Sequence, residues 1–361
     1  FLDALKIAFD LKIFGPGYVS NDVFEAGIAK FVSKHGPFDV VIGTEQIVLP
    51  HYYSKEHLVS KCWKSHVYKH PKEQMAKKES YDYLKSFAGI KAISFLETDF
   101  YSIKQVMIEK ILEADAYVVG AGAEFFRDYY QEEYSAHHIN GSNRWLDFVR
   151  AQKNRVISLT HMVSSKEICH KKLTNRKYDV CVPGAHYNKR VAMESALRTD
   201  NKFKMPSEVM NKNVLRMRSY MKIDRTNIGI KFLNYYFRYL LSNTRVVFTS
   251  PGALGYSIRK YFEIPISGAV LSCVPCEAYK ALGFENNINS VICEPNEVEK
   301  ITTLVNEDLY KYQEIADLGQ KLVEEKHSVN ARATQLKTSF ESIFEGRFKG
   351  SRWKNGEFCL M

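Results

Sequence analysis

The sequence has no apolar run approaching the ~20 residues that a membrane-spanning helix needs, and no N-terminal leader of the secretory kind. Its seven cysteines include one C-x-x-C spacing, from Cys273 to Cys276, but no second pair or nearby histidine completes a zinc site. These absences predict a cytoplasmic protein with reduced core thiols and no transmembrane segment. The chain begins at Phe1 rather than Met, so we expect it to be part of a longer polypeptide.

The length and the charge set further bounds. The 361 residues exceed one ordinary domain and fit two domains of roughly 150 to 200 residues each. The net charge of +10 indicates an anionic partner, because basic surfaces concentrate anions. Charge alone leaves a nucleotide phosphate, an acidic glycan, nucleic acid and a membrane surface open. No nucleic-acid recognition motif is visible, so we expect no nucleic-acid partner, whereas peripheral contact with a membrane stays open.

Short apolar runs alternate with helical segments along most of the chain, which is typical of a parallel sheet covered on both faces. A basic polar stretch at 166–177 separates two such series. The predicted strands are residues 5–14, 37–42, 91–95, 116–119 and 155–160 in the first series, and 178–182, 246–248, 269–271 and 291–293 in the second. We therefore predict an α/β protein with two doubly wound domains, 1–172 and 173–345, followed by a poorly ordered basic tail, 346–361.

Polar and glycine-rich turns follow several of these strands, at the sheet edge where ligands bind in open α/β folds. Gly15 and Gly17 flank a proline after the first predicted strand, and such a turn can present backbone amides to a diphosphate. A plain surface turn explains these two glycines equally well. The turns of the second series contain Tyr187, Lys189, Arg190 and Ser250. We expect the main ligand at this edge of the second domain.

The segment YSIRKYFEIPISGAVLSCVP and the helices after it resemble the carboxyl-terminal domain of GT-B-fold glycosyltransferases, above all the group 1 and spore-maturation-protein types. The first half of the chain matches only in its alternating architecture. The matching positions are Arg259, Glu263, Gly268, Glu297, Ile301, Ile315, Ala316, Gly319, His327, Ser328 and Arg332. The resemblance implies the GT-B fold, in which two Rossmann-like domains face a central cleft.

The resemblance further implies that a UDP- or GDP-sugar binds the second domain and that a glycan or other hydroxyl acceptor binds the first. Glu263 is in the position that contacts the ribose, and a carboxylate suits this role because it accepts hydrogen bonds from both ribose hydroxyls. Arg259, one helical turn earlier, is expected to neutralise phosphate, although an ion pair with Glu263 explains the same spacing. Lys189 and Arg190, with Tyr187 nearby, are expected to hold the leaving diphosphate, and a structural turn remains the alternative.

If the reaction inverts the anomeric centre, the first domain must supply a base that takes the acceptor proton. The candidates are Glu45, Asp99 and His161, each just past a predicted strand, and the order among them stays open. His161 is also the candidate for contact with the transferred sugar. The sequence contains no D-x-D motif, which the metal-dependent GT-A type uses. We therefore expect a metal-independent reaction without a cofactor.

The chain departs from the family pattern in two respects. Members with the E-x7-E motif carry another acid eight positions before Glu263, where this chain has Gly255. Pro265 and Ile266 replace the usual alanine-rich continuation, so the helix is predicted to end near Ile264. The missing acid keeps open the alternative that the chain is a catalytically inactive GT-B-like module that binds a glycan or a nucleotide.

Overall fold

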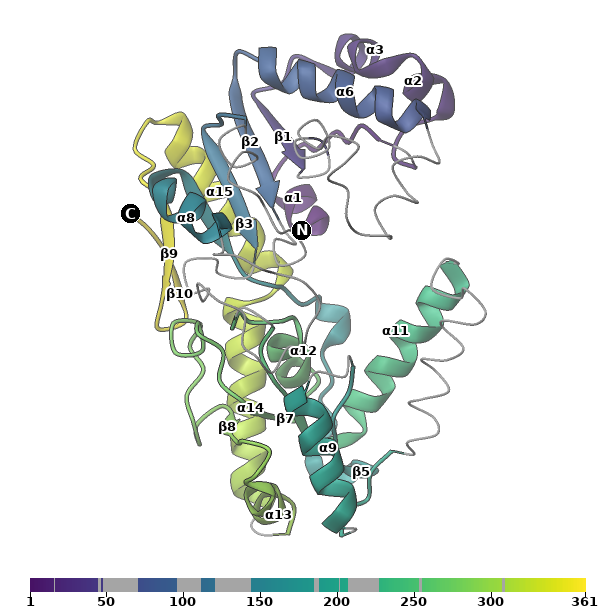
Figure 1. Cartoon of the computed structure of the whole chain (residues 1–361), viewed down its shortest axis with the longest axis vertical. Coiled ribbons are helices and arrows are strands. Elements are labelled where there is room, and N and C mark those ends of the chain that lie inside the picture. Colours follow the sequence, from purple (N-terminus) through teal and green to yellow (C-terminus); the bar gives the residue numbers. More distant parts are fainter. Residues whose placement is uncertain are drawn as a thin grey trace.

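A computed structural model describes residues 1–15, 17–44, 47, 71–95, 112–120, 144–184, 188–200, 202–206, 227–252, 255–306 and 309–361 of the chain. Its elements form two halves stacked along the long axis of the molecule, each built on a four-stranded sheet (Figure 1). Both sheets are parallel throughout, and within each the described strands follow the order of the sequence. The predicted α/β fold with two parallel sheets is confirmed.

The first sheet contains four of the five strands predicted for the first half of the chain. They are β1 (Val40–Thr44), β2 (Ile90–Phe95), β3 (Ala116–Gly120) and β4 (Val156–Leu159). Every residue of β3 and β4 is buried. This is expected for the inner strand β3, whereas β4 stands at the end of the sheet and lies beside the carboxyl-terminal segment Ser351–Lys354. The helices that accompany this sheet are α2 (Asn21–Glu25), α3 (Gly27–His35), α6 (Pro71–Ser86) and α8 (Arg144–Ala151).

The strand predicted at residues 5–14 is wrong, because the chain begins with a helix, α1 (Leu2–Ala8). Ala4 and Leu5 are buried, and α1 packs against α15 (Val329–Phe344) near the other end of the chain. Just after α1, the ring of Phe9 meets that of Phe340 edge to face at 5.5 Å. A short apolar run carries too few repeats to separate the helical from the extended period, and here packing against α15 decides.

The second sheet contains β5 (Tyr178–Cys181), β6 (Thr244–Thr249), β7 (Val270–Cys273) and β8 (Val291–Ile292), all at their predicted places. Val246 and Phe248 pack in one cluster with α9 (Asn188–Asp200) and α13 (Val298–Asn306), whereas Val247 packs on the opposite face. Helices α11 (Asn227–Ser242), α12 (Lys260–Ile266) and α14 (Leu309–Lys326) complete this half. The sheet is therefore covered on both faces.

Helix α12 runs two residues beyond the predicted end at Ile264 and contains Pro265. A proline this close to the carboxyl end removes at most one helical hydrogen bond, and Pro265 is itself buried. Gly319 of α14 permits the close approach of Asn289 O, to which a Cβ would lie 2.6 Å, while Pro265 Cβ at 3.5 Å from the same point would be in ordinary contact. Packing therefore outweighs the local preference of the proline.

The carboxyl terminus is a hairpin and not the poorly ordered tail that was predicted. Strands β9 (Ser351–Lys354) and β10 (Glu357–Leu360) pair in antiparallel fashion beside β4. Trp353 is buried and donates a 2.9 Å hydrogen bond from Nε1 to Ser158 O, while Ser351 Oγ accepts from Ser158 N at 2.8 Å. The basic residues suggested disorder, but the buried Trp353 anchors the segment.

Helix α15 also departs from the expected division of the chain. It was predicted to be the last helix of the second domain. However, Ala333, Leu336 and Phe340 lie in one hydrophobic cluster with α1 and the first sheet. The chain thus returns to the first half after α14. The division at residues 172 and 345 was drawn from the sequence of strands, which does not reveal this return.

The two crossings between the halves lie side by side. Val163 N donates to His327 O at 3.1 Å, and Val329 N donates to Val163 O at 3.0 Å. Arg332, fully buried, donates from Nε to Thr160 O at 3.1 Å, from Nη2 to His161 O at 3.2 Å, and to His327 Nδ1 at 2.8 Å. Because β4 leads directly into the first crossing, the carboxyl edge of the first sheet faces the second half (Figure 1).

Within the described residues, no helix combines the length and the apolar character that crossing a membrane requires.

Candidate functional site

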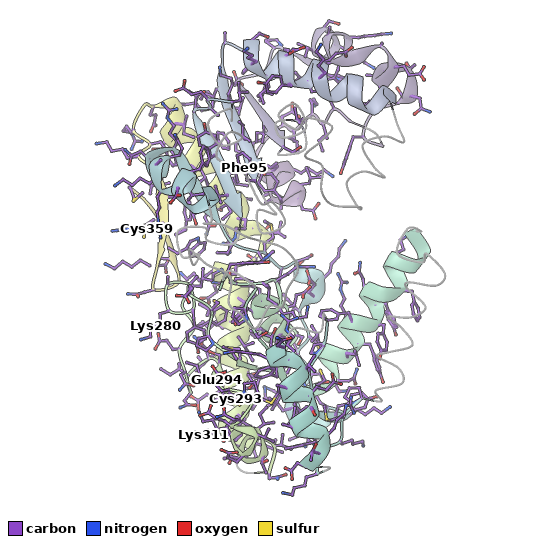
Figure 2. The ribbon with its side chains drawn as sticks, in the orientation of Figure 1. Phe95, Lys280, Cys293, Glu294, Lys311 and Cys359 are labelled. Carbon is purple, nitrogen blue, oxygen red and sulfur yellow. The ribbon has the colours of Figure 1, made fainter. Side chains whose placement is uncertain are left out.

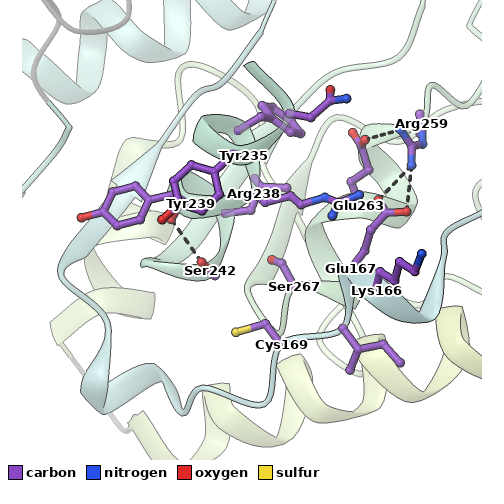
Figure 3. Close-up of a pocket in the computed structure, with 14 residues that line it drawn as sticks. Lys166, Glu167, Cys169, Tyr235, Arg238, Tyr239, Ser242, Arg259, Glu263 and Ser267 are labelled. Atoms are coloured by element: carbon purple, nitrogen blue, oxygen red, sulfur yellow. Dashed lines mark hydrogen bonds and ion pairs between the residues drawn. The ribbon is translucent and has the colours of Figure 1, made fainter. Parts of the chain in front are cut away.

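Glu263 lies on α12 within a three-residue ion cluster. Arg259, at the N-cap of the helix, contacts Glu263 Oε1 through Nη1 at 3.0 Å and Glu167 Oε2 through Nη2 at 2.8 Å (Figure 3). Ser164 and Glu167 form a capping box at the short 3-10 helix Ser165–Glu167, which fixes the Glu167 carboxylate. The expected alternative, an i,i+4 ion pair between Arg259 and Glu263, is therefore present, and a second carboxylate strengthens it.

This cluster borders a pocket of about 370 Å³ between α11, α12 and the segment after the first crossing. Figure 3 shows Arg238 extending from α11 toward Glu263, with Tyr235 and Tyr239 along the same wall. The lining residues are Lys166, Glu167, Ile168, Cys169, Asn234, Tyr235, Phe237, Arg238, Tyr239, Leu241, Ser242, Arg259, Glu263 and Ser267. Aromatic walls with a few converging charged groups suit a small polar ligand that has a planar part.

Burial raises the pKa of Glu263, while the nearby cations of Arg259 and Lys260 oppose the rise. The side chain of Glu263 is only 12% exposed, so its carboxylate has lost most of its water. A carboxylate in this state gains from accepting hydrogen bonds from hydroxyl groups of a ligand, since these replace the lost hydration. The environment therefore fits the ribose contact predicted for Glu263.

A second group of charged residues lies where β5 and β6 end. Gly184, in the turn after β5, has φ +100° and brings Lys260 of α12 and Arg190 of α9 together. A Cβ at Gly184 would lie 2.6 Å from Lys260 Nζ and 3.7 Å from Arg190 Nη1. Both cationic groups therefore lie within a few ångströms of the same point.

Arg190 connects this turn to the end of β6. The residue is buried, and its Nη2 donates to Ser250 O at 3.0 Å. The hydroxyl groups of Thr249, Ser250 and Ser257 are also buried, and the described residues offer them no hydrogen-bond partner. Buried hydroxyls without partners are uncommon, and here they gather at the predicted ligand edge. Arg190 and Ser250 are thus brought together as expected.

Lys189 points elsewhere. Its Nζ lies 3.1 Å from Glu294 Oε2, just after β8, where Figure 2 shows Glu294 beside Cys293. This ion pair offsets the charge of Lys189. For Lys189 the structure therefore favours the alternative of a structural turn that holds no ligand.

His161 directly follows β4 and lies between the two halves. Its ring centroid is 6.4 Å from that of Phe262 on α12. Burial lowers the pKa of His161 to about 4, with smaller effects from the cations of Arg259, Arg332 and Lys260. The imidazole is therefore neutral near pH 7 and can exchange hydrogen bonds with hydroxyl groups. His161 lies within electrostatic reach of Arg259 and Lys260, so the two sheet edges meet here.

Gly255 stands where the family pattern has an acid, and the backbone explains the glycine. Its φ of +76° is in the left-handed region, which a glutamate adopts only with strain. Glu277 N donates to Gly255 O at 2.9 Å, so another carboxylate-bearing residue lies beside this turn.

Several predicted site residues are not brought to this edge by the described structure. Gly15 and Gly17 form a local turn in which Tyr18 N donates to Gly15 O at 3.1 Å, and this turn follows a helix rather than a strand. Glu45, Asp99 and Tyr187 lie outside the described residues. Their roles stay predictions.

All six described cysteines are free thiols, and burial raises the pKa of Cys273 well above its usual value and that of Cys276 to about 12. Both are therefore protonated packing residues near neutral pH. Across the described ranges, no group of three or more His, Cys, Asp or Glu residues has a metal-binding arrangement.

No protein-family model matches the chain, and no curated protein matches it either. In fold it is similar to sucrose-phosphate synthase from Thermosynechococcus elongatus, with 10% identity over 92% of this chain and 82% of that chain and a TM-score of 0.47. It is similar to a glycosyltransferase from Rickettsia africae ESF-5, with 12% identity over 92% and 84% and a TM-score of 0.46. It is also similar to Anabaena Alr3699/HepE in complex with UDP and glucose, with 11% identity over 92% and 84% and a TM-score of 0.48. Likenesses this distant transfer no site residue and no substrate.

Lys260 and Glu167 were missed as site residues by sequence reasoning. Lys260 stands next to Arg259 in the motif, and only the turn at Gly184 shows which way it points. Glu167 lies in the stretch interpreted as a linker, and only the capping box fixes its carboxylate beside Arg259. The sequence shows that Lys260 is charged, but only the structure shows that it lies near Arg190 of α9 and Phe237 of α11.

Proposed function

We propose that the chain is a glycosyltransferase that moves a sugar from a UDP- or GDP-sugar to a hydroxyl group of a glycan or similar acceptor. The observation that carries the proposal is that Lys260, at one edge of the second sheet, lies within electrostatic reach of the Glu263 carboxylate on one side and close to Arg190 at the Gly184 turn on the other. A nucleoside diphosphate carries its ribose hydroxyls next to its phosphates. This edge likewise offers a hydrogen-bond acceptor, Glu263, next to the cations Lys260 and Arg190.

In the proposed arrangement the pocket beside α11 receives the nucleoside. Tyr235 and Tyr239 supply aromatic surface for the base, and Glu263 accepts hydrogen bonds from the ribose hydroxyls. Arg259 is held by Glu167 and Glu263, so its role is to fix the carboxylate rather than to bind phosphate. This differs from the role that the family resemblance implied for Arg259.

The chemical step breaks the bond between the anomeric carbon and the diphosphate oxygen. Negative charge grows on the diphosphate as this bond lengthens, and fixed cations stabilise that charge more than they stabilise the intact donor. Arg190 and Lys260 are positioned for this task. We expect the reaction to proceed without a divalent metal, and transfer measured in EDTA tests this.

His161 is placed for contact with the transferred sugar. Its pKa of about 4 keeps the imidazole neutral near pH 7, and the neutral ring can donate and accept hydrogen bonds with sugar hydroxyls. As a base for the acceptor proton it is about as weak as an ordinary aspartate or glutamate. We therefore propose that His161 orients the sugar, and the order among Glu45, Asp99 and His161 as the base stays open.

The test is a screen of UDP-, GDP- and dTDP-sugars by thermal shift, followed by assays of slow donor hydrolysis. A donor that binds only the folded chain raises the melting temperature by mass action. We expect Glu263→Ala to abolish the shift while leaving the melting temperature without donor nearly unchanged. Glu299→Ala, an exposed carboxylate on α13, is the matched control and keeps the shift. Equal shifts in both variants would remove Glu263 from the site.

The alternative of an inactive binding module rests on Gly255. It shares the thermal shift but predicts neither hydrolysis nor transfer by any donor that binds. Turnover of a bound donor above the buffer rate excludes this alternative.

A further inference from the structure

Helix α11 is held to the second half of the molecule at its carboxyl end. Of its side chains that the structure describes, Leu240 and Leu241 are buried, and both lie in the last turn, where the helix meets β6. Phe237, one turn earlier, packs partly against the same core. Figure 1 shows the amino-terminal end of α11 projecting away from the second half. The described side chains of residues 231–235 are accordingly exposed.

Three of these side chains form one stripe along the outer side of the helix. Tyr235 lies four positions after Lys231 and three after Phe232, so all three share a face. The buried Leu240 and Leu241 fall on the other side. Phe232 is 52% exposed and Tyr235 71% exposed. Two neighbouring aromatic rings left in water on a projecting helix indicate a surface that meets a partner. Lys231, Phe232 and Tyr235 are called the α11 stripe below.

The charge around the α11 stripe indicates which kind of partner it fits. Helix α11 contains two cations, Lys231 and Arg238, and no aspartate or glutamate. The sequence just before it, residues 211–226, lies outside the described residues. It contains Asp224 as its single acid, against Lys212, Arg216, Arg218, Lys222 and Arg225. A cationic, aromatic segment of this kind is complementary to an anionic surface.

We propose that the α11 stripe docks the protein on an anionic lipid surface, with the rings of Phe232 and Tyr235 in the interfacial layer and Lys231 against the head groups. Exposed rings gain from leaving water, and cations gain from meeting anionic head groups. A glycan fits the stripe less well, because sugar hydroxyls are recognised by carboxylates and amides, and the stripe has neither. Docking of this kind goes beyond the proposed sugar transfer and does not depend on it.

The α11 stripe can be changed without changing the pocket beside α11. Tyr235 borders that pocket, whereas Lys231 and Phe232 are not among the residues that line it. Two rings and a few cations give reversible binding, since stable anchoring takes stronger signals. Because salt screens the cations, binding should weaken as the salt concentration rises.

Flotation with lipid vesicles tests the docking. We expect the wild-type chain to bind vesicles of phosphatidylcholine that contain about one third phosphatidylglycerol, and to bind pure phosphatidylcholine far more weakly. Phe232→Ser should weaken binding about tenfold through the loss of one apolar ring. Lys231→Gln should weaken it about fivefold through the loss of one charge. Equal binding by the wild type and Phe232→Ser, or no binding by the wild type, would overturn the docking.

The matched controls are Phe344→Ser and Lys280→Gln, which should both bind like the wild type. Phe344, at the end of α15, is 54% exposed and thus comparable with Phe232. Lys280 is an exposed lysine on the outer side of the second half (Figure 2). A loss of binding in Phe344→Ser as large as that in Phe232→Ser would contradict a role specific to α11.

A fluorescence measurement separates insertion into lipid from attraction to any polyanion. In Phe232→Trp we expect the added indole to emit at shorter wavelength on the anionic vesicles and to be quenched by brominated acyl chains, and in Phe344→Trp we expect neither change. Vesicle binding without these changes would contradict the interfacial position of residue 232. Tight binding of heparin or single-stranded DNA, without binding to vesicles, would assign the stripe to a soluble polyanion and overturn the docking.

Discussion

Arg332 is fully buried and Lys260 is partly buried, and neither forms an ion pair with a carboxylate of the described residues, but their surroundings differ in one respect. Arg332 is fully buried and donates to Thr160 O, His161 O, Lys326 O, Gln335 Oε1 and His327 Nδ1, with its guanidinium 4.7 Å above the Trp353 ring. Lys260 contacts only the face of an aromatic ring among the described residues. Arg332 joins the two crossings, whereas Lys260 faces the proposed ligand edge.

The contrast shows how satisfied hydrogen bonds separate a structural cation from a binding cation. Burial lowers the pKa of both, to about 9 for Arg332 and about 8 for Lys260. The pKa alone therefore does not distinguish Arg332 from Lys260. The number of N–H groups that donate a hydrogen bond to the protein does. Arg176, which donates to Leu241 O, Thr244 O and Ser267 O, belongs with Arg332.

The largest expected effect is the loss of stability in Arg332→Met. The substitution leaves several buried carbonyl groups and His327 Nδ1 without a donor, and we expect the free energy of unfolding to fall by roughly 5 kcal/mol. Urea denaturation measures it, with Arg352→Met, an exposed arginine of β9, as the control. A loss below about 1 kcal/mol would mean that the crossings do not depend on Arg332.

Trp353→Ala tests a second contact of the structural cation Arg332. The indole covers Arg332 and donates to Ser158 O, so its removal creates a cavity and leaves one face of the cation open. We expect a loss of about 3 kcal/mol in urea denaturation. An unchanged midpoint would show that the hairpin frays without cost, as the sequence had suggested for this tail.

The two histidines near Arg332 add a pH dependence. Burial lowers the pKa of His161 to about 4 and that of His327 well below its usual value, while both titrate near 6.5 in the unfolded chain. Between these values the unfolded state binds more protons, so stability falls as the pH drops below about 6.5. We expect a slope of up to about 1.4 kcal/mol per pH unit for each histidine between pH 6.5 and 5.5. Stability that stays constant or rises over this range would contradict neutral histidines.

The smallest expected effect is that of Lys260→Met on the chain without ligand. A binding cation with unfilled donors costs folding free energy, so replacing it with an apolar side chain should leave stability unchanged or raise it by up to ~1 kcal/mol. The measurement is the same urea midpoint. A fall of more than about 1 kcal/mol in the free energy of unfolding would show that Lys260, like Arg332, is a structural residue, and would contradict the distinction between them.

The sequence predicted the buried strands well, because inner parallel strands such as β3 and β6 are short apolar runs bounded by turns. It failed at residues 5–14 and at the carboxyl-terminal tail, where partners distant in the chain decide the outcome. The alignment of Glu263 with the family pattern pointed to the edge of the second sheet at which the ligand is proposed to bind, and this stays a prediction. It did not identify Lys260, whose direction depends on Gly184 and Phe237, or Glu167, whose carboxylate pairs with Arg259.

The most direct test of a diphosphate site at this edge is the ³¹P NMR spectrum of UDP or GDP, whichever binds, recorded with the wild-type chain in EDTA. We expect both phosphate resonances to shift or broaden with the protein, and Lys260→Met to reduce the effect while Lys280→Met leaves it intact. Resonances that stay at their free positions with saturating wild-type protein would contradict the site.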